Sequence, residues 1–216
     1  MSDEERRDDL HAERVILDRA IGGWRGMIDS GLPTAVFVTV YTISGQRLRE
    51  SLIAAVAVSL LLAVVRVVQK RSLQQVGAGF AGVAIAAAFS AWTGRAEDFF
   101  LPGVITNAVY GSVVLVSILI RWPILGVIVG LLTGQGMSWR KSRELQRVFA
   151  AASWIWVGLF AGRLLVQVPL YLAGEVELLG AVRIVLGWPA FIAAAYFTYR
   201  VLAPTYRSMR ATDPHS

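Results

Sequence analysis

The sequence predicts an all-α protein, a polytopic transmembrane helical bundle with six spans and one short non-crossing half-helix. Hydrophobic residues make up 56% of the 216 positions, whereas charged residues make up only 17%. The apolar residues also form several runs that are long enough to cross about 30 Å of hydrocarbon as helices. A soluble domain of this length would not carry so many such runs, so the class is a multi-pass membrane protein.

The chain divides into three predicted parts: a charged segment (1–26), a transmembrane helical domain (27–203) and a polar tail (204–216). The first part alternates acidic and basic residues and lacks the early apolar core of a cleavable signal peptide. Its sparse apolar residues leave two alternatives open, a short helix on the membrane surface or a frayed tail.

Six apolar runs of helix length follow in order, separated by short polar connections. The first has a Leu-Pro pair near its start, at residues 32–33, where proline is acceptable in a first helical turn. The second ends in basic residues, and the third is rich in the Ala and Gly that favour close helix packing. The fourth ends at an Arg-Trp-Pro sequence (121–123), and the last two flank an acidic turn. The predicted spans are Ile28 to Ser44, Ser51 to Val67, Gln75 to Trp92, Gly103 to Ile120, Val148 to Leu172 and Leu179 to Ala203.

One further apolar stretch, at about 124–133, is too short to cross the membrane as a helix. It is expected to be re-entrant, interfacial or a broken half-helix. Gly126, Gly130 and Gly134 recur in it at four-residue spacing, so one face should accept a neighbouring helix.

The distribution of Lys and Arg predicts the topology. With six crossings, the side opposite the N-terminus holds only Arg47, Arg49 and Arg95, whereas the N-terminal side holds most other basic residues, including those of the 139–147 loop. Cytoplasmic loops carry such an excess, so both termini are expected in the cytoplasm of a bacterial cell, with the chain in the plasma membrane.

The fifth span carries a charge among apolar residues. Arg163 and Gln167 lie four residues apart and therefore share one helix face. A cation at such depth costs about 2.5 kcal/mol or more, so it should face a partner, water or the bundle interior. The alternative is that Arg163 reaches the outer surface or bonds a loop carbonyl.

A candidate polar site gathers around this helix, toward the outer side of the membrane. Its other members are Asn107 in the fourth span, Arg183 in the last span, and Glu97 and Asp98 in an outer loop. Pairing of the arginines with the acids would make a structural network that seals the bundle. The functional alternative is a pocket for an anion or lipid head group, with the amides at the start of the fourth span as additional donors.

No catalytic, metal or cofactor site is expected. The chain has no cysteine and only two histidines, and both histidines lie in the polar tails. A GxGxxG pattern at 77–82 has no preceding strand, so helix packing explains it better than dinucleotide binding. The net charge of +6 arises beside apolar segments, so membrane lipids rather than nucleic acid are the expected partners.

Four runs carry a family resemblance: GLPTAVF (31–37), GRAEDFFLPG (94–103), RWP (121–123) and QVPLYLAG (167–174). Over about residues 22 to 203 the chain resembles an uncharacterised family of actinobacterial integral membrane proteins. In the order of its spans it is more distantly similar to the intracellular septation protein A family. That second resemblance implies a role in envelope growth or division, and neither family supplies catalytic residues.

Two functions follow as hypotheses. The first is a non-enzymatic membrane protein that contacts other envelope proteins, or copies of itself, within the bilayer. The second is a small transporter or channel for an ion, lipid or anionic solute, with Arg163, Gln167, Asn107 and Arg183 along the route.

Overall fold

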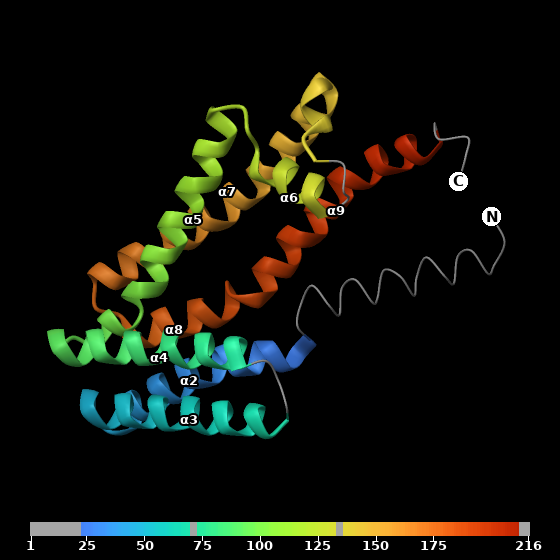
Figure 1. Ribbon diagram of the computed structural model, residues 1–216. Coiled ribbons are helices and arrows are strands. Elements are labelled where there is room, and N and C mark those ends of the chain that lie inside the picture. The colour runs from blue at the N-terminus through green and yellow to red at the C-terminus, as the bar shows by residue number, and fades with distance from the viewer. Residues whose placement is uncertain (1–22, 70–72, 133–135, 212–216) are drawn as a thin grey trace. The chain divides into compact units, whose positions relative to one another are not determined.

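The computed structural model describes residues 23–69, 73–132 and 136–211, and every regular element within those ranges is a helix (Figure 1). The predicted surface helix before residue 22 and the last residues of the tail lie outside the described residues. The chain forms two compact units, residues 1–99 and 100–216, which are described separately. The all-helical fold predicted from composition is therefore confirmed.

The described part of the first unit contains three long helices in sequence and one short 3-10 turn. α2 packs against α3, and α3 packs against α4. The ring of Phe37 on α2 stacks on Phe99 at 4.1 Å between centroids, and both side chains are buried. The hydroxyl of Ser90 on α4 donates to the carbonyl oxygen of Arg95 at 2.7 Å, which fixes the turn between α4 and η1. The bounds are α2 Gly23–Ile43, α3 Leu48–Val68, α4 Leu73–Thr93 and η1 Glu97–Phe99.

The second unit is built around α7, which packs against each of the other four α-helices of the unit. α5 and α7 lie side by side (Figure 1), and a Cβ built at Gly111 would come within 3.0 Å of the Phe160 Cβ. The Trp156 indole donates to the Thr198 hydroxyl at 3.0 Å and ties α7 to α9. The bounds are α5 Leu101–Leu119, α6 Ile124–Leu132, η2 Ser138–Lys141, α7 Arg143–Leu172, α8 Val176–Val185 and α9 Trp188–Ala211.

Five of the described segments are long and apolar enough to cross a membrane, and α2 adds a shorter apolar stretch, Gly31–Ile43. This number agrees approximately with the six predicted spans. The nine residues of α6 rise only about 14 Å, so this helix is too short to cross, as expected. The 30 residues of α7 extend about 45 Å, so the helix is longer than the hydrocarbon is thick.

Three local expectations differ from the structure. Pro33 lies inside α2, because the helix begins ten residues earlier at Gly23 rather than beside the proline. The predicted last span is divided at Leu186 and Gly187 into α8 and α9. The glycine face of α6 meets an indole rather than a helix: the Trp139 ring lies 3.0 Å from a Cβ built at Gly126.

Candidate functional site

Arg163 binds the junction between α8 and α9. Its Nε donates to the carbonyl oxygen of Leu186 at 2.7 Å, and its Nη2 donates to that of Gly187 at 2.6 Å. The Leu186 carbonyl follows the last turn of α8, where a helix has no further amide to satisfy it, whereas the Gly187 carbonyl also accepts from the Phe191 amide of α9 at 3.2 Å. The negative end of the α8 dipole also favours a cation at this position. The guanidinium therefore caps a helix within the apolar region, which is one of the two alternatives left open above.

Asn107 and Gln167 extend this arrangement from α7 to α5. Arg163 Nη1 donates to Asn107 Oδ1 at 3.4 Å, and Asn107 Nδ2 donates to Gln167 Oε1 at 3.3 Å. Gln167 is buried, with 7% of its surface exposed. All three guanidinium nitrogens of Arg163 are thus engaged, and the polar atoms connect α5, α7 and the α8–α9 junction.

Arg183 stands apart from this cluster. Its guanidinium carbon lies 5.9 Å from the centre of the Phe100 ring, and Nη1 lies 3.5 Å from a Cβ built at Gly103. It faces the first turn of α5, and among the described residues it makes neither a hydrogen bond nor an ion pair. Gly103 leaves the room that this large side chain occupies.

The two predicted acids belong to the first unit. Glu97 accepts from Arg95 at 2.7 Å, and Asp98 is buried with 3% of its surface exposed. The pairing of Arg163 with an acid is not found, because backbone carbonyls occupy its guanidinium instead. In the ranges that the structure describes, no three acidic or histidine side chains gather to form a metal site.

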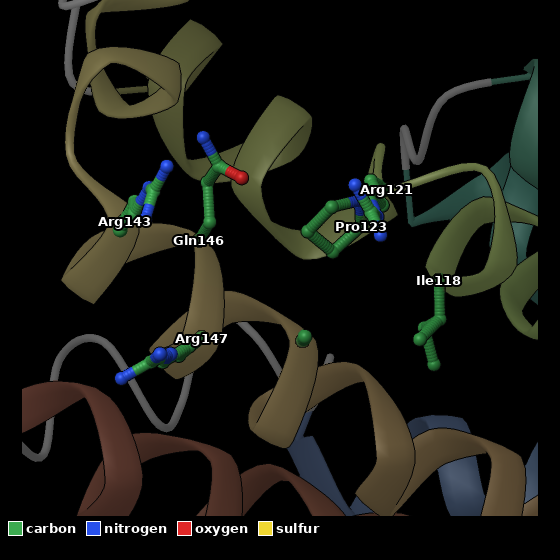
Figure 2. Close-up of a pocket in the computed structure, with 7 residues that line it drawn as sticks. Ile118, Arg121, Pro123, Arg143, Gln146 and Arg147 are labelled. Atoms are coloured by element: carbon green, nitrogen blue, oxygen red, sulfur yellow. The ribbon is translucent and has the colours of Figure 1, made fainter.

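A second feature is a basic hollow of about 530 Å³ between the α5–α6 connection and the first turns of α7 (Figure 2). Arg121 and Pro123 come from the connection, whereas Arg143, Gln146 and Arg147 come from α7. The apolar side chains of Ile118 and Ala150 complete its lining.

The three arginines of the hollow are exposed and have no carboxylate partner among the described residues. Gln146 is held in place by its own bond, in which Nε2 donates to the Arg140 carbonyl at 2.6 Å. The sequence predicted that these basic residues orient the chain and contact membrane lipids, but it did not predict that they line a common hollow. The signal that was available is the spacing of Arg143 and Arg147, four residues apart and thus on one helix face.

Long apolar helices with polar groups turned into helix–helix contacts define a multi-pass integral membrane protein. The chain belongs to a family described as "Protein of unknown function (DUF3159)", whose model matches residues 21–209. Neither the search of curated proteins nor that of solved structures found a match.

Proposed function

We propose that this chain is a non-enzymatic protein of the bacterial plasma membrane that acts through contacts with other membrane helices in the plane of the bilayer. The observation that carries the proposal is one face of α7 that the helices of its own unit leave uncovered. The side chains along this face are exposed: Ala151, Trp154, Gly158, Ala161 and Leu165.

The composition and spacing of this α7 face suit helix association. Its residues recur at alternating intervals of three and four, which is the period of two helices that supercoil. No side-chain or backbone atom of a neighbouring described segment lies within 4 Å of a Cβ built at Gly158 or Gly162. Small residues at such positions allow backbones to approach closely in lipid, where no hydrophobic force drives association.

The interior cluster also favours this proposal over transport. All three guanidinium nitrogens of Arg163 donate hydrogen bonds to backbone carbonyls or to Asn107. The side chain therefore holds helices together and does not present a free cation to a solute. The role in envelope growth and division rests on the resemblance in span order to the septation protein A family. The cytoplasmic placement of both termini rests on the distribution of Lys and Arg.

A photo-crosslinking amino acid at position 165 tests the proposal in intact cells. We expect adducts with membrane proteins or with a second copy of the chain, and we expect Gly158→Ile to reduce them because a branched side chain holds the helices apart. The control places the same crosslinker at Val113 on α5, which is 50% exposed and lies outside the α7 face. Recovery of lipid adducts alone from position 165 would contradict lateral association.

The second candidate is a small transporter or channel for an ion, lipid or anionic solute. Two observations favour it: Arg183 has no acidic partner in the described residues, and the last apolar segment is broken into α8 and α9. Broken helices often form the binding sites of transporters. Purified protein in liposomes should then move an anion across the bilayer, and Arg183→Gln should abolish that flux. Wild-type protein that is folded and moves none of the anions tested would remove this candidate.

A further inference from the structure

We infer that the basic hollow between the α5–α6 connection and α7 binds a phosphate group, supplied by the head group of an anionic phospholipid. Three arginines line one hollow, Arg121 from the connection on one side and Arg143 and Arg147 from α7 on the other (Figure 2). Guanidinium groups present paired donors that match phosphate oxygens, and each bond is assisted by charge. A basic pocket at the end of membrane helices is the usual setting for such head groups.

Arg121 has a backbone conformation that residues other than glycine rarely adopt. Its φ is 57°, in the left-handed region that favours glycine. The Trp122 amide donates to the Ser117 carbonyl at 2.8 Å, and the Arg121 amide donates to that of Ile118 at 3.0 Å, which closes the end of α5. Glycine is the usual residue at this position of a helix terminus. An arginine here brings strain and a charge, so its benefit must lie outside the local backbone.

The two arginines of the hollow that lie at the start of α7 are also placed unfavourably. Arg143 is the first residue of the helix, so its cation lies at the positive end of the helix dipole. Arg147 stands one turn further on the same face, and like charges at this spacing repel each other. An anion in the hollow would neutralise these repulsions together. The arrangement is therefore unfavourable for the empty hollow and favourable for an occupied one.

The surroundings favour a lipid as the source of the phosphate. Ile118, Pro123 and Ala150 give the hollow an apolar lining, which suits the glycerol and upper acyl chains better than a free ion. Trp122 lies beside the hollow, with the Arg140 guanidinium stacked 4.5 Å from its ring centre. Tryptophan is enriched where membrane meets water, at the depth of lipid head groups. Lateral contact through the α7 face does not depend on this hollow.

The test uses the full-length protein in neutral detergent, titrated with phosphatidylglycerol, phosphatidylcholine or inorganic phosphate. Native mass spectrometry measures bound lipid, and the thermal unfolding midpoint reports stabilisation by each added compound. We expect phosphatidylglycerol to bind more tightly than the other two. Arg121→Gly and Arg147→Gln should each weaken its binding by about tenfold or more, because each removes a charge-assisted phosphate contact. Lys141→Gln, which removes a neighbouring charge outside the lining, should change it by less than about threefold.

The Arg121→Gly variant also separates a ligand role from a structural one. Without lipid its midpoint should equal or exceed that of the wild type, because glycine relieves the left-handed backbone. Gln46→Gly is the matched control, since Gln46 has a φ of 66° and lies outside the hollow. It should relieve similar strain without affecting lipid binding. Equal losses in Arg121→Gly and Lys141→Gln would overturn the site in favour of diffuse attraction. Inorganic phosphate that binds as tightly as phosphatidylglycerol would overturn the lipid as its source.

Discussion

At the residue scale, Arg163 shows how one charged side chain is accommodated among apolar residues without a carboxylate. Its planar fork reaches two successive carbonyl oxygens, those of Leu186 and Gly187, and the Leu186 carbonyl lies where α8 has no further amide to donate to it. A third donor reaches Asn107. The cation and the helix end satisfy each other, because each would be costly to leave unbonded in an apolar medium.

Replacing Arg163 should destabilise the protein, because the guanidinium and the α8–α9 junction stabilise each other. We expect Arg163→Met to lower the free energy of unfolding by about 2–4 kcal/mol, because the Leu186 carbonyl and the Asn107 side-chain oxygen lose a donor and the Gly187 carbonyl keeps only the Phe191 amide. Arg163→Lys should recover little, since a single ammonium cannot reproduce the planar fork. Unfolding by sodium dodecyl sulfate, followed by circular dichroism, measures both variants. A lysine variant as stable as the wild type would show that charge alone suffices.

At the element scale, the two breaks in the second unit have different causes. The α8–α9 junction depends on Gly187, where a Cβ would lie 2.6 Å from the Arg183 carbonyl oxygen. The α5–α6 connection depends on Ser117, whose hydroxyl accepts from the Ile124 amide at 3.2 Å. α6 is then held by Trp139, which packs edge to face against Phe149 on α7. These contacts stabilise the helix ends on either side of the two breaks.

The α6 contact predicts a selective response to small substitutions. Gly126→Ala should destabilise the protein by about 1–3 kcal/mol, because the added methyl meets the buried Trp139 ring at 3.0 Å. Gly82→Ala on α4 is the control, since no neighbouring atom lies within 4 Å of a Cβ there. It should be neutral or slightly stabilising, because alanine favours helix. Thermal unfolding in detergent gives both values, and equal effects would count against close α6–Trp139 packing.

The α8–α9 junction predicts a second response at this scale. Gly187→Ala should lower stability by about 1–3 kcal/mol, because its methyl must displace backbone rather than a flexible side chain. The displaced carbonyls would also move away from Arg163, so the loss should shrink in an Arg163→Met background. A double-mutant cycle on unfolding midpoints measures this coupling. Fully additive losses would show that the glycine and the arginine act separately.

At the scale of the whole molecule, the charge distribution and the helices together predict how the chain lies in the membrane. The connection before α7 and the first turns of that helix hold Arg140, Lys141, Arg143 and Arg147, whereas the turn before α8 holds Glu175. The long helix α7 separates the two, so they are expected on opposite faces. We expect the positive side to be cytoplasmic.

Cysteine labelling can test this topology cleanly, because the chain contains no cysteine. In intact cells, a membrane-impermeant maleimide should label Glu175→Cys and leave Lys141→Cys unlabelled. Cysteines introduced at Ser2 and Ser216 should also stay unlabelled until the cells are lysed. Labelling of one terminus but not the other before lysis would refute an even number of crossings.

The sequence by itself determined the class of protein and most of its helices. Apolar runs such as Ser51 to Val67 have only one low-energy form in lipid, where each backbone amide must be bonded within its own helix. The same reasoning identified α6 as too short to cross. It also selected Arg163, Gln167 and Asn107 as polar groups that need partners, although not which partners they find.

Tertiary structure decided those partners and the division of the last apolar run. The division of the last apolar run at Gly187 leaves no mark in hydropathy, since both halves are apolar, and it depends on a guanidinium supplied by another helix. The basic hollow likewise depends on the fold, because the path of the chain around α6 brings Arg121 into the same lining as Arg143 and Arg147. Periodicity reports which face of a helix is apolar, whereas contacts between helices depend on distances that only the folded chain fixes.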